Sequence, residues 1–333
     1  MRYRVTLIEG DGIGPEVTAA TAEVLEAAGA PIEWEKMPGG LRAFEAFGEP
    51  MPRPTLDSIL RNKVGLKGPL ATPKGGGYRS ANVALRKTLD LFVGWRPVRS
   101  LPSLVTRHHG VDLVVLRENT QDLYAGIEHE ITPGTVVTLK VSTAEAGRRI
   151  AAWAFEYART QGRRRVTVVH KRSVLPRTDG AFVDAFYDVG ANYPFIQQDD
   201  VSLDDLSLGL VQEPERFDVL LLQNLYGDII SDLAAGLVGG LGVVPGANVG
   251  KHVAVFEAVH GTAPDIAGQG KANPLAVLMS AVLMLDHMGE RRVADRVRAS
   301  IDHTLAGPIR TGDLGGRAGT AEFTAALIDN LPR

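Results

Sequence analysis

The stretch Val5-Thr-Leu-Ile-Glu-Gly-Asp-Gly-Ile-Gly-Pro15 opens the chain with an apolar segment, a glycine-rich turn and a helix-starting proline. Val5 to Ile8 is short and apolar, as expected of a strand that is covered on both faces. Gly10, Gly12 and Gly14 permit a tight turn, and proline is favoured at the first position of a helix. The glycine spacing differs from the dinucleotide fingerprint, which has two residues before its last glycine. We therefore predict a structural strand-to-helix turn here rather than a pyrophosphate site.

The same alternation of apolar strands with helical segments continues along the chain. Further strands are predicted at Val64–Leu66, Val111–Leu116, Val166–His170, Val219–Leu222 and Ala254–Phe256. Helices are predicted from Pro15 and at Val83–Leu91, Thr143–Thr160, Phe182–Val189, Ala276–Met288, Arg292–Leu305 and Ala321–Leu331. This alternation indicates an α/β fold with largely parallel sheets covered on both faces. A length of 333 residues favours two lobes, with a cleft between them.

One segment departs from the alternation. Gly126 to Ser142 has alternating β-forming residues around the turn signal Thr132-Pro-Gly134, which predicts a two-stranded arm. Exposed strand edges in such an arm need a pairing partner. We therefore expect the arm to contact a second subunit.

Composition excludes several classes of protein. The net charge of −3 gives no nucleic-acid footprint, and the absence of cysteine excludes disulfides, thiolate metal sites and a cysteine nucleophile. No apolar run is long enough to span a bilayer. The first residues enter a strand pattern directly, without a secretory signal. These features predict a cytoplasmic enzyme.

Three aspartates have the character of divalent-metal ligands. Asp204 follows Val201-Ser-Leu, while Asp228 and Asp232 lie four residues apart in Asn224-Leu-Tyr-Gly-Asp-Ile-Ile-Ser-Asp232. Residues four apart share one face of a helix, so these two carboxylates repel each other unless a cation lies between them. Oxygen ligands of this kind suit Mg²⁺ or Mn²⁺. The alternative for the two helical acids alone is a solvated helix face.

A second group of residues favours binding of an anion. Ser80 and Asn82 follow the Gly75-Gly-Gly77 loop at the start of a predicted helix, where their simpler role is to cap backbone donors. Helix N-termini attract anions, and arginine pairs with carboxylates through two parallel donors. The arginines at helix or strand ends are Arg86, Arg96 and Arg117. Together with a metal site, they indicate a multiply charged acid as the ligand.

Taken together, these blocks resemble the β-decarboxylating dehydrogenases, which act on isocitrate, homoisocitrate or 3-isopropylmalate. The resemblance covers essentially the whole chain and is strongest at Glu9–Glu16, Lys67–Arg86, Arg117–His129, Val168–Lys171, Asn224–Gly240 and His260–Asn273. It implies a two-lobed fold of that family, not a Rossmann fold, with the β-arm at a dimer interface. The implied large cofactor domain comprises residues 1–97 and 246–333. The small domain comprises residues 98–245, with the arm at about 126–142 and the dimer contact.

The resemblance also implies roles for individual residues. Tyr124 and Lys171 match the acid–base pair of the family, and Lys171 and Asp204 are implied to serve the site of a second subunit. Arg86, Arg96 and Arg117 would hold the substrate carboxylates. Ser80 and Asn82 resemble the isocitrate type and would bind its third carboxylate, whereas the isopropylmalate type carries apolar residues there. A polar site of this kind rejects an apolar analogue, because its own donors would be left unpaired.

The cofactor segment is His260-Gly-Thr-Ala-Pro-Asp-Ile-Ala-Gly268, followed by Asn273. Its simplest interpretation is a Gly/Pro loop that leads to a helix. By resemblance it wraps the adenosine end of a dinucleotide, and the implied cofactor residues are Thr72, His260, Gly261, Thr262, Ala263, Asp265, Ile266 and Asn273. Asp265 and Ile266 stand where NADP-dependent relatives tend to carry Lys and Tyr. A carboxylate there would repel a 2′-phosphate, so NAD is the predicted cofactor.

The resulting hypothesis is an NAD-dependent isocitrate dehydrogenase that forms 2-oxoglutarate and CO₂ with Mg²⁺ or Mn²⁺, as a homodimer with shared sites. Two alternatives stay open: a dehydrogenase for homoisocitrate or another malate-type acid such as 3-isopropylmalate, and a non-catalytic regulatory subunit. The complete set of Tyr124, Lys171 and the three aspartates argues against the last. The chain departs from the family pattern at Gly94, Gln121, Ser173 and Gly209.

Overall fold

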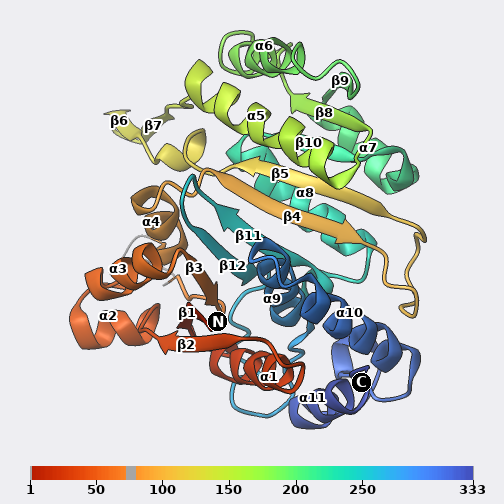
Figure 1. Ribbon diagram of the computed structural model, residues 1–333. Coiled ribbons are helices and arrows are strands. Elements are labelled where there is room, and N and C mark those ends of the chain that lie inside the picture. Colours follow the sequence, from red (N-terminus) through yellow and green to blue (C-terminus); the bar gives the residue numbers. More distant parts are fainter. Residues whose placement is uncertain (1, 73–79, 333) are drawn as a thin grey trace.

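The computed structural model describes residues 2–72 and 80–332, so the predicted Gly75–Gly77 loop lies outside the described residues. Within them, one sheet runs through the whole molecule (Figure 1). Its strands are β1 (Tyr3–Ile8), β2 (Ile32–Lys36), β3 (Val64–Lys67), β4 (Val93–Arg99), β5 (Asp112–Glu118), β8 (Arg165–His170), β9 (Gln197–Ser202), β10 (Val219–Leu222), β11 (Pro245–Val249) and β12 (Ala254–Ala258). They are ordered β2-β1-β3-β12-β11-β4-β5-β10-β8-β9.

The helices cover this sheet in two groups (Figure 1). The group beside β1 to β3 comprises α1 (Gly14–Ala27), α2 (Leu41–Phe47), α3 (Arg53–Asn62), α4 (Ala81–Thr88), α9 (Leu275–His287), α10 (Arg291–Ala306) and α11 (Thr320–Asp329). The group toward the other end comprises α5 (Ala144–Gln161), α6 (Thr178–Gly190), α7 (Leu203–Gln212) and α8 (Asn224–Leu237). Short 3-10 turns occur at η1 (Leu123–Ala125), η2 (Pro214–Arg216), η3 (Leu241–Val243) and η4 (Gly312–Leu314). No helix in the described part of the chain combines the length and apolar character that crossing a bilayer requires.

The centre of the sheet differs from the predicted parallel arrangement. Pairings toward both edges are parallel, but the β12–β11, β11–β4 and β4–β5 pairings are antiparallel. The sheet therefore contains two parallel halves that run in opposite directions, joined through β11 and β4. Both joining strands come from segments that the sequence analysis did not identify as strands.

The predicted strands and helices are all present, with ends shifted by up to a few residues, whereas four strands and the helices α2 and α3 were missed. β4 and β11 contain glycine and proline, which local preference places outside strands. β2 and β9 are the edge strands of the sheet and are rich in charged or polar residues. Edge strands tolerate such residues because one of their sides faces solvent.

The N-terminal glycine turn is a packing feature, as predicted. Gly10 and Gly12 have φ values of 79° and 59°, in the region that favours glycine. A Cβ on Gly12 would lie 2.0 Å from the carbonyl oxygen of Thr262, and the backbone N–H of Ile13 donates to that oxygen at 2.9 Å. The turn therefore supports the predicted cofactor segment through its backbone.

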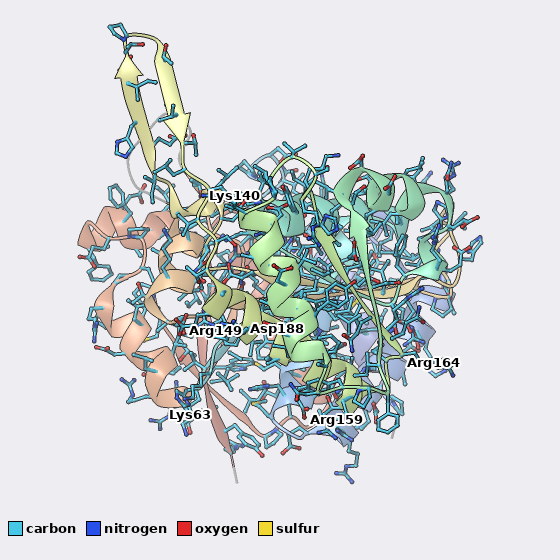
Figure 2. All side chains as sticks on the ribbon, turned by 90° about the horizontal axis from the view of Figure 1, so that it is seen from above. Lys63, Lys140, Arg149, Arg159, Arg164 and Asp188 are labelled. Atoms are coloured by element: carbon cyan, nitrogen blue, oxygen red, sulfur yellow. The ribbon has the colours of Figure 1, made fainter. Side chains whose placement is uncertain are left out.

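The predicted arm consists of β6 (Glu128–Thr132) and β7 (Thr135–Thr138), which pair antiparallel. Figure 2 shows it projecting far from the body of the molecule. Ile131 and Val136 are each 61% exposed. An isolated two-stranded hairpin with exposed apolar side chains is marginally stable in water, so the arm has the character of an interface element.

Candidate active site

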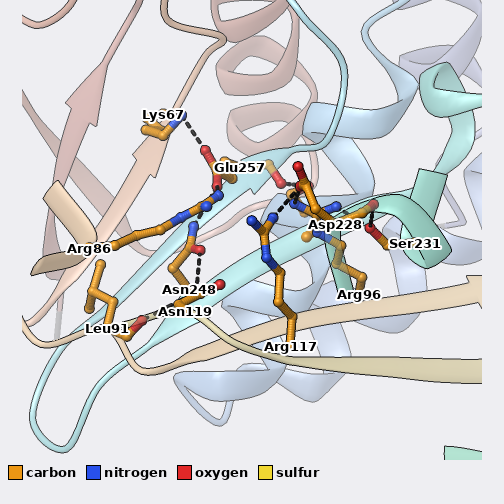
Figure 3. Close-up of polar contacts among 12 residues, drawn as sticks. Lys67, Arg86, Leu91, Arg96, Arg117, Asn119, Asp228, Ser231, Asn248 and Glu257 are labelled. Atoms are coloured by element: carbon orange, nitrogen blue, oxygen red, sulfur yellow. Dashed lines mark hydrogen bonds and ion pairs between the residues drawn. The ribbon is translucent and has the colours of Figure 1, made fainter. Parts of the chain in front are cut away.

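A cavity of about 250 Å³ lies beside the antiparallel centre of the sheet. The described residues that line it include four cationic and two carboxylate side chains, an excess of two positive charges: Lys67, Arg86, Arg96, Arg117, Asp228 and Glu257. They come from β3, α4, β4, β5, α8 and β12 (Figure 3). The topology thus brings the three predicted substrate arginines together from segments that are distant in sequence.

The three arginines are buried and crowd one another. Burial, followed by the charges of Arg86 and Arg96, lowers the pKa of Arg117 to about 10. Burial and the charge of Arg86 also lower the pKa of Arg96. Among the described residues, buried Nε of Arg86 and Nη2 of Arg117 have no hydrogen-bond partner. Buried polar groups are normally satisfied, so these donors indicate that an anionic ligand completes the cavity.

Two glycines leave the space that the Arg117 side chain occupies. A Cβ on Gly227 would lie 2.6 Å from Arg117 Cγ, and one on Gly94 would lie 3.2 Å from Arg117 Cβ. Arg117 also donates from Nε to Asn224 Oδ1 at 2.9 Å and from Nη1 to Asp228. The unusual Gly94 therefore has a steric explanation, because it lets β4 lie against the arginine and against Asn119.

Arg86 is positioned by a buried carboxylate (Figure 3). Its Nη2 donates to Glu257 Oε1 at 3.1 Å, and Glu257 also pairs with Lys67 and accepts from Asn248 at 2.5 Å. Burial alone would raise the pKa of Glu257, but the charges of Lys67 and Arg86 hold it well below its usual range. The carboxylate is therefore ionised and fixes both cations at the cavity wall. Sequence reasoning did not identify Lys67, Asn248 or Glu257.

Tyr124 lies at the same cavity. Its hydroxyl donates to Asp228 Oδ2 at 2.5 Å, and its ring centroid is 4.9 Å from Arg117 Cζ. Burial and the hydrogen bond to Asp228 raise the pKa of Tyr124. The hydroxyl is therefore protonated at neutral pH, as a proton donor has to be.

Ser80 and Asn82 face this cavity instead of capping the helix. Ser80 is the N-cap residue of α4, but its side chain makes no capping hydrogen bond within the described residues. Asn82 Oδ1 is buried and has no partner among them. Both residues line the cavity with Arg86. Their capping interpretation is therefore not supported, and their polar groups are available to a ligand.

Asp228 and Asp232 stack on α8 one turn apart. Asp228 lies 3.8 Å and Asp232 3.6 Å from the guanidinium of Arg96. Burial, together with the charge of Asp228, raises the pKa of Asp232 despite the nearby arginine. A divalent cation would relieve this repulsion, and Asp232, whose side chain is 56% exposed, has oxygen lone pairs available. The two residues present therefore fit part of a Mg²⁺ or Mn²⁺ site.

Lys171 and Asp204 form a separate pair on the same chain. Lys171 Nζ donates to Asp204 Oδ1 at 2.5 Å, and the Asp204 side chain is 64% exposed. The hydrogen bond from Lys171 lowers the pKa of Asp204. Within the described residues, no three acidic or histidine side chains of one chain gather as a metal site. One chain thus brings Asp228 and Asp232 together but leaves Lys171 and Asp204 apart from them.

The cofactor segment borders a second cavity of about 510 Å³, which meets the first at His260 and Gly261. Of the predicted cofactor residues, His260, Gly261, Ala263, Ile266 and Asn273 line it. Burial lowers the pKa of His260, so its imidazole is neutral near pH 7. The predicted cofactor segment therefore lies directly beside the arginine-lined cavity.

Three predicted cofactor residues are not among the described lining residues of this cavity. Thr72 is exposed, Thr262 supports the Gly10–Gly14 turn through its carbonyl, and Asp265 is exposed. The lining instead carries Asp313 together with Lys271 and Arg317, which sequence reasoning missed. Asp313 accepts from Asn273 Nδ2 at 2.8 Å, a contact between segments forty residues apart. The charged side chains that line this cavity are of both signs, and the repulsion of a 2′-phosphate by Asp265 stays a prediction.

Two further departures from the family pattern have structural explanations. Gly209 on α7 packs against Phe217, because a Cβ there would lie 2.9 Å from Phe217 Cζ. The Gln121 amide exchanges hydrogen bonds with the N-cap residue of α5, Thr143, at 2.8 and 2.9 Å. Nothing in the structure explains Ser173, which is exposed after Lys171.

The fold is α/β, built on one large sheet, and it places an arginine-lined cavity beside an acidic helix face. A model of the isocitrate/isopropylmalate dehydrogenase family matches residues 4–328, and the chain belongs to that family. The predicted family and enzyme class, a β-decarboxylating dehydrogenase, are thereby confirmed.

Three similar proteins illustrate the match. "Probable isocitrate dehydrogenase (NAD) subunit alpha, mitochondrial" from Drosophila melanogaster is 49% identical over 98% of this chain and 87% of the relative. The chloroplastic 3-isopropylmalate dehydrogenase from Solanum tuberosum is 47% identical over 91% of this chain and 85% of the relative. The crystal structure of isocitrate dehydrogenase from Methylococcus capsulatus superimposes with a TM-score of 0.96 at 45% identity, covering 100% of both chains.

The prediction of a cytoplasmic location is wrong. Isocitrate dehydrogenase relatives from animals, a plant and yeast are mitochondrial. Location is set by recognition of targeting segments, so the composition and cavities of a folded domain carry no information about it.

Proposed function

We propose that this chain catalyses the NAD-dependent oxidative decarboxylation of isocitrate to 2-oxoglutarate and CO₂, with Mg²⁺ or Mn²⁺ bound. The observation that carries the proposal is the cavity in which three buried arginines, with unpaired donors on Arg86 and Arg117, adjoin the Asp228–Asp232 pair. Adding Asp232 to this lining leaves an excess of one positive charge, which the combined charge of −1 on a tricarboxylate and a divalent cation complements. NAD is the cofactor in the printed name of the Drosophila relative.

Each residue of the site then has a role. Arg86, Arg96 and Arg117 bind and orient the substrate carboxylates, while Ser80 and Asn82 offer hydrogen bonds to the third one. Lys171, paired with Asp204, accepts the proton of the 2-hydroxyl group. After loss of CO₂, Tyr124 donates a proton to C3 of the resulting enol. Asp204, Asp228 and Asp232 would hold the divalent ion, which would polarise the hydroxyl oxygen, and the His260–Asn273 cavity would hold NAD, which would supply the hydride acceptor.

We also propose a homodimer in which Lys171 and Asp204 of one subunit complete the site of the other. Support comes from the separation of this pair from Asp228 and Asp232 within one chain, and from the projecting β6–β7 arm. The Drosophila relative is named as a subunit of a larger enzyme, so a heteromeric assembly is the alternative.

The proposed domain division is residues 1–97 with 246–333, and residues 98–245. The boundary after residue 97 lies in β4, and the boundary before residue 246 lies in β11. These are the two antiparallel strands at the centre of the sheet. The anion cavity is lined from both parts, by Arg86 and Glu257 on one side and by Arg117 and Asp228 on the other. Closing of one part on the other would therefore shield the substrate from water.

The proposal is tested by purifying the chain with Mn²⁺ and measuring NADH formation from isocitrate, homoisocitrate, 3-isopropylmalate, malate and tartrate. The measurement is then repeated with NADP. Isocitrate with NAD is expected to give the highest kcat/KM. A higher value for another acid would overturn the proposed substrate, and no turnover with any acid would favour a regulatory subunit.

A second candidate is a 3-isopropylmalate or homoisocitrate dehydrogenase, because the Solanum relative is nearly as similar as the Drosophila one. Ser80 and Asn82 disfavour isopropylmalate, because the Ser80 hydroxyl and the Asn82 amide N–H can donate to a carboxylate but find no acceptor in an isopropyl group. The Asn82→Leu variant separates these readings. It should lower kcat/KM for isocitrate on the order of a hundredfold or more, and lower that for isopropylmalate little or not at all.

A further inference from the structure

A buried ion cluster lies where the arm joins the body of the molecule. It consists of Asp122, Lys140 and Asp179, whose side chains are 3%, 10% and 0% exposed. Figure 2 shows Lys140 at the base of the arm. None of the three has a role in the proposed chemistry, and two carboxylates with one cation leave a net negative charge buried. Such an arrangement is costly to hold unless neighbouring donors compensate it.

Asp179 contacts the backbone of the proposed general base. It lies in the first turn of α6, where its Oδ2 accepts from the backbone N–H of Lys171 at 2.7 Å. Its Oδ1 accepts from Lys140 Nζ at 2.7 Å. The carboxylate therefore fixes the end of β8 from which the Lys171 side chain emerges, and Lys140 supplies its counterion.

Asp122 lies close to the proposed acid in the sequence and connects its turn to α8. It directly precedes η1, the turn that carries Tyr124, and has a φ of 71°. Its Oδ2 accepts from the backbone N–H of Leu225 at 2.8 Å, at the start of α8, the helix that bears Asp228. Lys140 Nζ lies 3.6 Å from the other oxygen of Asp122.

Tyr226 on α8 contacts two residues of this cluster, Lys140 and Asp179. Its hydroxyl lies 3.2 Å from Asp179 Oδ2 and 3.3 Å from Lys140 Nζ. Its ring centroid is 4.3 Å from the same ammonium group, which adds a cation–π contact. Lys140 therefore contacts Asp122, Asp179 and Tyr226. Among the described residues, no other cationic side chain forms an ion pair with Asp122 or Asp179.

We propose that Lys140 is a positioning residue that ties the base of the arm to both proton-transfer residues, through Asp179 to Lys171 and through Asp122 to Tyr124. The inference rests on the proposed function of those two residues. Without the ammonium group, the two buried carboxylates repel each other and both backbone anchors shift. A displacement of about 1 Å in a catalytic group can reduce the rate on the order of a hundredfold. A movement of the arm would be transmitted to both residues by the same contacts.

The test uses the full-length protein with isocitrate, NAD and Mn²⁺, and compares Lys140→Met, Lys140→Arg and Asp179→Asn with the wild type. Matched controls are Lys251→Met, an exposed lysine in the β11–β12 turn, and Asp188→Asn, an exposed aspartate on α6. The measurements are kcat, the KM values for both substrates, melting temperature, and the isotope effect with isocitrate deuterated at C2. If Lys140→Met does not fold, Asp179→Asn carries the test, because an amide keeps the shape of the carboxylate.

A folded Lys140→Met or Asp179→Asn protein is expected to lose kcat on the order of a hundredfold, with the KM for NAD nearly unchanged. The isotope effect on kcat should change: it rises if the shift of Lys171 makes hydride transfer the slow step, and falls if the shift of Tyr124 makes protonation at C3 the slow step. Lys140→Arg should recover part of the rate. A loss of activity with an unchanged isotope effect would show only a smaller active fraction and would overturn the inference. So would an unchanged kcat. Absence of isocitrate turnover by the wild type would instead refute the proposed function.

Discussion

Glu257 shows how a single residue combines stability with substrate binding. Its carboxylate, 7% exposed, lies between Lys67 and Arg86 and accepts from Asn248. Removing one member of a buried ion cluster leaves the remaining charges uncompensated. This loss destabilises a protein far more than an ion pair on the surface stabilises it. The same contacts aim Arg86 at the cavity.

Glu257→Gln should therefore lower the free energy of unfolding at pH 7 by about 3–5 kcal/mol. The pH dependence also has a definite sign. The pKa of Glu257 is held below its usual value, so its contribution is complete above an unfolded pKa of about 4.3 and is lost as pH falls through the folded value. Urea unfolding between pH 3 and pH 7 checks both points, with exposed Glu156→Gln as the control. An equally steep acid loss in Glu257→Gln would contradict the account.

Tyr124 is the residue whose chemistry can be isolated from hydride transfer. Oxalosuccinate, the β-keto acid, needs only loss of CO₂ and protonation at C3. Tyr124→Phe should slow formation of 2-oxoglutarate from oxalosuccinate by about 10²–10⁴-fold, because the proton donor is missing. The raised pKa of Tyr124 predicts that the wild-type rate does not fall through loss of this proton until the pH is above 10. Normal product formation by the variant would remove Tyr124 from the mechanism.

At the scale of elements, α8 combines close packing with chemistry. Its Gly227 lies against Arg117 on β5, so the helix can present Asp228 to that arginine. A second glycine of the same helix, Gly236, has no atom within 4 Å of where its Cβ would lie. The two positions form an internal comparison of a required and a dispensable glycine.

Gly227→Ala should displace Arg117 and cost about 1–3 kcal/mol through overpacking. The KM for isocitrate should rise as well, because Arg117 loses its alignment with the substrate. Gly236→Ala should instead stabilise the protein by up to about 1 kcal/mol, as expected of alanine in a helix. Thermal unfolding and steady-state kinetics measure both effects. If both variants had the same stability and the same KM for isocitrate, the contact between Gly227 and Arg117 would determine neither property.

At the scale of the whole molecule, the open question is which chain completes each site. Lys171 and Asp204 pair with each other on the chain that carries them, away from Asp228 and Asp232. A shared site predicts that two inactive variants can restore activity together, whereas a site within one chain does not.

Lys171→Met and Tyr124→Phe should each be nearly inactive alone. Co-expressed in equal amounts, they should recover about a quarter of wild-type activity, since half of the dimers are mixed and each mixed dimer has one intact site. Isocitrate-dependent NADH formation by the purified mixture measures this. No recovery in a sample shown to contain mixed dimers would mean that Lys171 serves its own chain.

The sequence by itself determined the elements with strong local patterns and named candidate ligand-binding residues, several of which line one cavity. Apolar strands such as β10 and amphipathic helices such as α5 form where predicted, because their hydrophobic periodicity matches one backbone geometry. The three arginines, Tyr124 and Asp228 could be named because each residue type suits a charged substrate or a metal.

Only the tertiary structure decided what those residues face. β4 and β11 became strands despite proline and glycine, because neighbouring strands satisfy their backbone groups. Lys67 and Glu257 line the arginine cavity although sequence reasoning did not name them, because burial and contact depend on which distant segments the sheet brings together. Local preference is set by a few neighbouring residues, whereas desolvation, ion pairing and close packing are properties of the assembled fold.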